Sequence, residues 1–314
     1  MRQTHKTNKQ IMIQHPKRLL ACLLIIPCIL SFISCASTRD IIHTVTESNS
    51  LESPLFSGHR GLQPFGPENS FAAFEACAPH GLWAIETDFR LTSDGVVICM
   101  HDATLDRTTN GSGPVKEHTW SEIKALEIQE VNGNTVDKCY DYTALSKRQK
   151  SVPTMDDYFR ICRKGGLVAF VELKEDDGVI EQLNRCIARH GMQGRCVISS
   201  SNRDLLAAYR AKGGKELIHL IFAKTDDIDW LVSLGNAALA FNYPDLSQEV
   251  HLQHGNIHID SLKELVDHCH AMGLKICFRA VDTPEAERQS AALGIDYFPT
   301  NNLWPGRGQK TTHL

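Results

Sequence analysis

Eight short runs of apolar and β-branched residues recur along the chain, and stretches with a helical pattern separate them. The runs cover residues 55–59, 84–90, 167–174, 196–200, 217–222, 238–241, 274–280 and 297–300. The helical patterns include residues 70–78, 178–190, 202–211 and 261–272. Strands that alternate with helices in this way pair in parallel, and the helices pack outside the sheet. Eight such units predict an α/β fold, a (β/α)8 TIM barrel.

The length of the chain fits one such barrel with extra segments. Its 314 residues are 42% hydrophobic, and a single barrel of this kind takes about 250 residues. We therefore expect one domain over residues 55–314. Residues 96–151 are too long for a simple connection between the second and third strands, and they carry turn signals at 110–113 and 132–134. They predict an insertion on the barrel face, which would place His101 over the end of the barrel.

Residues 1–35 have the features of a targeting segment and are excluded from the fold. A basic pair, Lys17-Arg18, precedes an apolar run at 19–33, which is shorter than the roughly 20 residues that span a bilayer. The run ends in Phe32-Ile33-Ser34-Cys35, which resembles the box where bacterial lipoproteins are cleaved and lipidated on cysteine. An ordinary cleaved signal or an uncleaved anchor is the alternative. Polar residues 36–54 then predict a flexible tether, so we expect an exported protein with a lipid anchor that faces the periplasm or the cell surface.

Charge and cysteine content exclude other classes of partner and site. The net charge is −4 and the isoelectric point is near 6.4, with no basic stripe, so nucleic acid is not an expected partner. The chain has 11 cysteines but no Cys-x-x-Cys pair. The sequence therefore predicts neither a zinc motif nor a particular disulfide bond.

Charged residues two positions apart occur at the ends of the second and third predicted strands. Residues two apart on a strand share one face, and the C-terminal ends of barrel strands line the functional end of this fold. Charges that point into a barrel are costly to bury unless they are paired or bind a metal. Glu86, Asp88 and Glu172 suit one hard divalent cation, Mg²⁺ or Ca²⁺. The alternative is a simple ion pair between Glu172 and Lys174, with Glu86 solvated.

An ordered set of short motifs extends over most of the predicted barrel. The motifs are His59-Arg60-Gly61, Pro67-Glu68-Asn69, Glu86-Thr87-Asp88, His101-Asp102, Leu105-Asp106-Arg107-Thr108-Thr109, Val171-Glu172-Leu173-Lys174, Val197-Ile198-Ser199-Ser200 and Gly294-Ile295-Asp296-Tyr297-Phe298-Pro299-Thr300-Asn301. This set resembles the glycerophosphodiester phosphodiesterase family. The resemblance implies a TIM barrel with an insertion after the second strand, and it also implies that Glu86, Asp88 and Glu172 are metal ligands.

The remaining motif residues have chemistry that suits phosphodiester cleavage. Histidine can both take and give a proton near neutral pH, so His59 and His101 are the candidate acid and base. The other 13 histidines are interpreted as structural or solvated. Arg60 and Lys174 are expected to bind phosphate oxygens. Glu68 joins this substrate-binding group by orienting Arg60 or the metal ligands, or it forms only a loop ion pair.

These expectations combine into a metal-dependent hydrolase that cuts small glycerophosphodiesters to sn-glycerol 3-phosphate and an alcohol. A phospholipase-D-like lyase that acts on intact lipids is one alternative. An inactive, surface-anchored binding barrel is another; the loss of a motif histidine or carboxylate would mark it, and none is lost. The run 106–109 is interpreted as a structural brace.

Overall fold

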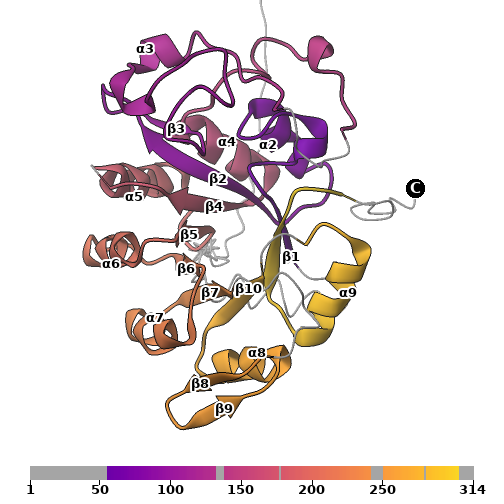
Figure 1. Cartoon of the computed structure of the whole chain (residues 1–314). Helices are drawn as coiled ribbons and strands as arrows, with labels where there is room; N and C mark the ends of the chain where they lie inside the picture. The colour runs from indigo at the N-terminus through magenta and orange to yellow at the C-terminus, as the bar shows by residue number, and fades with distance from the viewer. Residues whose placement is uncertain (1–54, 132–137, 177, 242–249, 279–280, 304–314) are drawn as a thin grey trace, which may run out of the picture. The chain divides into compact units, whose positions relative to one another are not determined.

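The computed structural model describes residues 55–131, 138–176, 178–241, 250–278 and 281–303 (Figure 1). The predicted leader at residues 1–35 and the tether at 36–54 lie outside these residues. Among the described helices, none is both long enough and apolar enough to cross a bilayer.

Eight parallel strands form a closed barrel in the described part of the chain. They are β1 (Leu55–Gly58), β2 (Ala84–Leu91), β4 (Val168–Leu173), β5 (Cys196–Ser200), β6 (Leu217–Ile221), β7 (Ala237–Phe241), β10 (Lys275–Phe278) and β11 (Tyr297–Thr300). Neighbours pair in the order β1, β11, β10, β7, β6, β5, β4, β2, and the pairing of β2 with β1 closes the sheet. The predicted (β/α)8 barrel is confirmed, and each predicted strand ends within two residues of the observed one.

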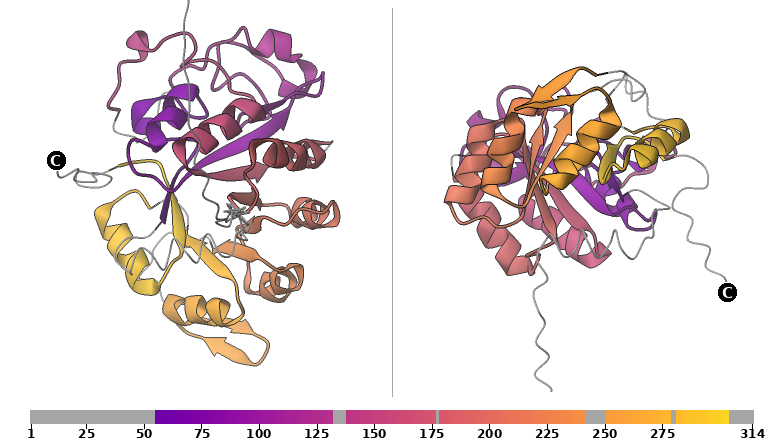
Figure 2. Two further views of the ribbon diagram at one scale, coloured as in Figure 1. Left: turned by 180° about the vertical axis from the view of Figure 1, so that it is seen from behind. Right: turned by 90° about the horizontal axis from the view of Figure 1, so that it is seen from below.

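Helices pack around the outside of the barrel (Figure 2). They are α2 (Phe71–Cys77), α4 (Met155–Gly165), α5 (Val179–His190), α6 (Arg203–Ala211), α7 (Ile228–Leu234), α8 (Leu262–Ala271) and α9 (Pro284–Leu293). The predicted helical stretches correspond to α2, α5, α6 and α8. The Ser70 hydroxyl accepts a hydrogen bond from the Ala73 amide and caps α2, and Ser261 caps α8 in the same way. Gly273 follows α8 with a φ of 79°, a left-handed conformation typical of helix ends.

Side chains alternate along each strand between the inside of the barrel and the shell beneath the helices. On β4, Val168 and Phe170 belong to an apolar cluster inside the barrel, whereas Ala169 and Val171 belong to the larger core under the helices. Glu172 is the next residue of the inward series. The same alternation places the two acidic residues of β2 inside. The apolar cluster thus fills the lower barrel, and charged side chains occupy its C-terminal end.

The connection between β2 and α4 forms a compact segment with a core of its own. It contains β3 (Val97–Cys99), which pairs antiparallel with β2, the helix α3 (Trp120–Ile123) and the 3-10 turns η2 (Val115–Glu117) and η3 (Tyr142–Ala144). A separate apolar cluster holds this segment together; it consists of Ile98, Met100, Leu105, Val115, Ile123, Ile128 and Val152. The segment predicted as an insertion is therefore a packed structure, and it carries His101.

Some short elements were not predicted from the sequence. They are β3, the antiparallel hairpin of β8 (Leu252–His254) and β9 (Ile257–Ile259), and the 3-10 turns η1 (Gln63–Phe65) and η4 (Thr225–Asp227). Three residues are too few to show a period of two, so the apolar pattern carries no signal for them.

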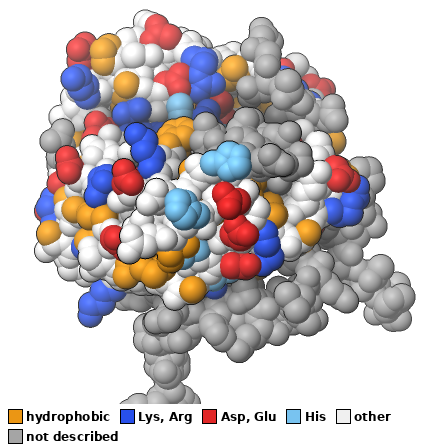
Figure 3. Space-filling view, turned by 60° about the horizontal axis from the view of Figure 1, so that its bottom comes forward, with side chains coloured by type: hydrophobic (Ala, Val, Ile, Leu, Met, Phe, Trp, Pro, Cys, Tyr) orange, Lys and Arg blue, Asp and Glu red, His pale blue; other side chains and the backbone are white. Residues whose placement is uncertain are grey.

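On the face shown in Figure 3, acidic, basic and histidine side chains are interspersed.

Candidate active site

A pocket of about 200 Å³ lies at the C-terminal ends of the barrel strands. Six predicted site residues line it; they are His59, Arg60, Glu86, His101, Glu172 and Lys174. The other two, Asp88 and Glu68, are buried beside the pocket and contact its lining residues. The rest of the lining is mixed: Phe170, Ile221, Phe222, Cys277 and Pro299 are apolar, and Ser199, Ser201 and His219 are polar. The structure thus brings the eight predicted residues into one place.

The three acidic residues predicted as metal ligands lie close together. One carboxylate oxygen from each of Glu86, Asp88 and Glu172 lies within 4.8 Å of the others. Burial, together with the charges of Asp88 and Glu172, raises the pKa of Glu86 well above its usual value. Burial and Asp88 also raise the pKa of Glu172. A cation would relieve this repulsion, and a set of carboxylate oxygens fits a hard divalent ion.

Two basic side chains border the carboxylates. Lys174 Nζ lies 3.0 Å from Asp88 Oδ1 and 2.5 Å from Glu172 Oε1, so the alternative ion pair is present but is shared with Asp88. Burial raises the pKa of Asp88, but Lys174 and Arg60 outweigh it and hold that pKa at about 2. Arg60 Nε lies 3.7 Å from Asp88 Oδ2, and Arg60 lines the pocket. Its guanidinium therefore places a positive charge beside the carboxylates, where it can attract a phosphate group.

His59 is oriented by residues from the other end of the chain. Its Nδ1 lies 2.7 Å from Asn301 Oδ1. Asn301 donates from Nδ2 to Asp282 Oδ2 at 2.9 Å and from its backbone amide to Oδ1 at 2.7 Å. Because the carboxylate accepts these bonds, the Asn301 amide nitrogen faces Asp282 and its oxygen faces His59. Nδ1 of the neutral ring therefore carries the proton, and Nε2 carries the lone pair.

His101 is oriented by a chain of charged groups. Its Nδ1 lies 2.7 Å from Asp102 Oδ1, and Asp102 accepts bonds from Arg107 Nε at 2.6 Å and Nη2 at 2.9 Å. These bonds lower the pKa of Asp102, which keeps the carboxylate charged beside the imidazole. Arg107 also donates twice to Glu68 at 2.8 Å, and Glu68 accepts from Arg60 Nη1 at 3.0 Å. Glu68 thus connects Arg60, which follows β1, with Arg107, which holds Asp102 beside His101.

Backbone strain concentrates at this pocket. In the described segments, the non-glycine residues with positive φ are Arg60 at 57°, Asn69 at 54°, Phe222 at 59° and Asn236 at 45°. Arg60 and Phe222 line the pocket, and Asn69 donates to Asp88 Oδ2 at 3.1 Å. Such conformations cost about 1–3 kcal/mol each and persist where the surroundings impose them. Their grouping supports the assignment of this pocket as the functional site.

Several positioning residues were not identified from the sequence. Asn69 and Asn301 occur in the motifs, but the motifs alone show no role for them. Arg107 belongs to the run interpreted as a structural brace, and the structure shows it bonded to Asp102 and Glu68. Asp282 lies in none of the motifs. The His59–Asn301 contact joins residues 242 positions apart, so no local pattern reveals it. The signal that could have found Asn301 is its place directly after the last strand, where barrel sites gather.

Comparison with known proteins shows sequence similarity over most of the chain. The model of the glycerophosphoryl diester phosphodiesterase family matches residues 59–303. A glycerophosphodiester phosphodiesterase of Caldanaerobacter subterraneus subsp. tengcongensis is 28% identical over 252 residues, which cover 79% of this chain and 94% of that protein. One of Bacillus subtilis is 30% identical over 196 residues, which cover 59% of this chain and 64% of that protein.

Solved structures share the fold. A putative glycerophosphoryl diester phosphodiesterase from Silicibacter pomeroyi has a TM-score of 0.66 at 23% identity, over 82% of this chain and 92% of that one. An Oleispira antarctica phosphodiesterase in complex with its product sn-glycerol-3-phosphate has a TM-score of 0.62 at 20% identity, over 79% and 93% of the two chains.

Proposed function

Because this chain belongs to the glycerophosphoryl diester phosphodiesterase family, we propose that it hydrolyses glycerophosphodiesters to sn-glycerol 3-phosphate and an alcohol, using one divalent cation and two histidines. One observation carries the proposal. A single pocket combines carboxylates that suit a cation, basic groups that suit a phosphate, and two histidines that are held in different ways. The product in the Oleispira antarctica complex supports the choice of substrate.

Arg60 and Lys174 bind the phosphate in this proposal. The Arg60 guanidinium pairs with Asp88 Oδ2 and Lys174 pairs with Asp88 Oδ1, so both place positive charge at the pocket. A Mg²⁺ or Ca²⁺ ion held by Glu86, Asp88 and Glu172 would supply further positive charge to polarise the phosphoryl group. Together these groups favour the charge that develops on the phosphoryl oxygens in the transition state.

The hydrogen-bond partners of the histidines suggest how they divide the work. His59 is bonded to a neutral amide oxygen, so its ring is suited to be neutral and to take a proton at Nε2. His101 is bonded to the Asp102 carboxylate, which stabilises the positively charged ring. We assign His59 as the base that activates the nucleophile. His101 is then the acid that protonates the leaving alkoxide.

Removing one predicted ligand tests the proposal. Glu172→Gln keeps the side-chain shape but removes a charge, so turnover should fall about a thousandfold or more. Exhaustive chelation should have the same effect. The measurement is release of sn-glycerol 3-phosphate from a panel of glycerophosphodiesters, and a cyclic phosphate product would instead indicate lyase chemistry.

Glu75→Gln is the matched control, because Glu75 pairs with Arg148 on the surface and does not line the pocket. It should keep full turnover. Undiminished turnover in Glu172→Gln, or after chelation, would contradict the cation-dependent mechanism.

A further inference from the structure

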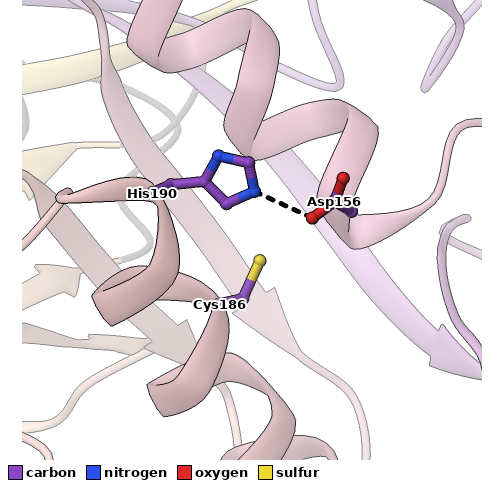
Figure 4. Close-up of side chains that lie close together, drawn as sticks. All are labelled: Asp156, Cys186 and His190. Carbon is purple, nitrogen blue, oxygen red and sulfur yellow. Dashed lines mark hydrogen bonds and ion pairs between the residues drawn. The ribbon is translucent and has the colours of Figure 1, made fainter.

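Three side chains that commonly bind transition metals meet on the outside of the barrel, between α4 and α5 (Figure 4). Asp156 lies in the first turn of α4, and Cys186 and His190 lie in the second half of α5. Cys186 and His190 are four residues apart, so they share one face of the helix. None of the three lines the barrel pocket. This group therefore has no part in the chemistry proposed above.

The ligand atoms are close enough to share one ion. A carboxylate oxygen of Asp156, the Cys186 sulfur and a ring nitrogen of His190 lie within 4.8 Å of one another. His190 Nε2 lies 2.8 Å from Asp156 Oδ1. Bonds of about 2.0–2.3 Å to a tetrahedral zinc ion place neighbouring ligand atoms roughly 3.3–3.7 Å apart. Small side-chain rotations are enough to reach that geometry.

The surroundings leave room for an ion to enter. A pocket of about 300 Å³ lies directly beside the group and is lined by Asp156, Cys186 and Arg189, among others. Arg189 now pairs with Asp156 and donates to Cys186 Sγ at 3.6 Å. Its side chain is 64% exposed, so it can turn into solvent. An ion pair between exposed side chains contributes little stability, and its loss opposes metal binding only weakly.

We propose that Asp156, Cys186 and His190 bind a zinc-class transition metal ion, with water or an external ligand in the fourth position. A set of one sulfur, one nitrogen and one oxygen favours Zn²⁺ over the hard cations that suit the barrel carboxylates. On binding, the Cys186 S–H bond breaks, its proton goes to solvent, and the thiolate sulfur bonds to the ion. No zinc motif marks this site in the sequence, because the ligands come from two helices.

The bound ion would link α4 to α5 close to the junction between α4 and the inserted segment. Thr154, which caps α4, pairs with Ile98 of the inserted segment, and the Cys99 amide donates to the Pro153 carbonyl at 2.9 Å. Asp156 follows this junction by two residues. A metal bound there would therefore stabilise the base of the segment that carries His101. Binding should raise the melting temperature by mass action.

Cobalt titration of the full-length chain tests the proposal. The protein is stripped of metal, kept reduced and titrated with Co²⁺, whose thiolate complexes absorb strongly in the near ultraviolet. We expect a band that saturates at one equivalent and disappears when Zn²⁺ is added. Cys186→Ser should abolish the band, and His190→Ala should weaken binding about a hundredfold or more. Zn²⁺ should raise the melting temperature of the wild type but not of these variants.

Two controls separate this site from others. Glu172→Gln should keep the band, because the barrel site has no sulfur ligand. Cys139→Ser should also keep it, because Cys139 is an exposed thiol elsewhere in the chain. If Cys186→Ser is poorly folded by circular dichroism, Asp156→Asn replaces it, since that side chain is 46% exposed. No band in the wild type, or an unchanged band in the folded ligand variants, would overturn the proposal.

Discussion

The two candidate catalytic histidines present the same ring nitrogen to different partners. His59 Nδ1 meets the amide oxygen of Asn301, whereas His101 Nδ1 meets the carboxylate of Asp102. Both partners fix the proton on Nδ1, but only the carboxylate stabilises the charged ring. This difference in one acceptor atom is what assigns the base and the acid in the proposed reaction.

Replacing Asp102 tests that assignment at the scale of a single residue. Asp102→Asn removes the charge that supports the protonated ring of His101, and the new amide can also face Nδ1 with its nitrogen. We expect kcat to fall about a hundredfold or more, while KM changes little. Asp204→Asn, an exposed carboxylate on α6, should leave kcat unchanged. An undiminished kcat in Asp102→Asn would argue against His101 as the acid.

At the scale of elements, the sequence predicts the strands whose burial requires a particular pattern of apolar residues. A parallel strand buried on both faces must be a continuous apolar run, so all eight barrel strands were identified. Charged residues two apart, such as Glu86 and Asp88 on β2, interrupt the apolar pattern of the inward face, which is why they marked the site. The three-residue strands β3, β8 and β9 were missed because they are too short to carry a period. The Asn301–Asp282 support was missed because it depends on how distant loops meet.

A buried carboxylate fastens the last two barrel strands to a helix. Asp296 accepts hydrogen bonds from Lys275 Nζ at 2.8 Å, from His270 Nε2 at 2.8 Å and from the Ile276 amide at 2.7 Å. These groups belong to β10 and α8, while Asp296 immediately precedes β11. Burial alone raises the pKa of Asp296, but the bonds from His270 and Lys275 outweigh it and lower the pKa below its usual value. The ionised form is therefore the one that stabilises this part of the barrel.

Asp296→Asn should lower the free energy of unfolding by about 2 kcal/mol at neutral pH, as for lost charge-assisted hydrogen bonds. A lowered pKa in the folded state stabilises the fold above the unfolded value of about 3.9, and this contribution disappears as the pH falls toward the folded value. The difference between wild type and variant in urea denaturation should therefore be full above about pH 5 and shrink on acidification. Asp267→Asn, an exposed control on α8, should show little difference. If the difference in free energy of unfolding between wild type and Asp296→Asn did not change with pH, the ionised form of Asp296 would not be the stabilising one.

At the scale of the whole molecule, two separately packed parts build one pocket. The barrel strands and the turn after β1 supply Glu86, Glu172 and His59, and the inserted segment, which has its own apolar cluster, supplies His101. Arg107 and Glu68 join the two parts by ion pairs. The eight predicted site residues all lie between residues 59 and 174, and none of them comes from residues 1–54. Asn301 and Asp282, from the other end of the chain, orient His59.

Attachment to a membrane should consequently be separable from catalysis. We propose that Cys35, which lies outside the described residues, carries a lipid, and that residues 36–54 connect it to β1. A segment of this length reaches at most about 65 Å, which leaves the barrel free to meet small substrates near the membrane. Cys35→Ser should move the protein from the membrane to the soluble fraction, or leave an unprocessed precursor, with unchanged turnover per molecule. Fractionation, mass spectrometry and the phosphodiesterase assay together measure this. Unchanged partitioning with unchanged mass would show that Cys35 is not the anchor.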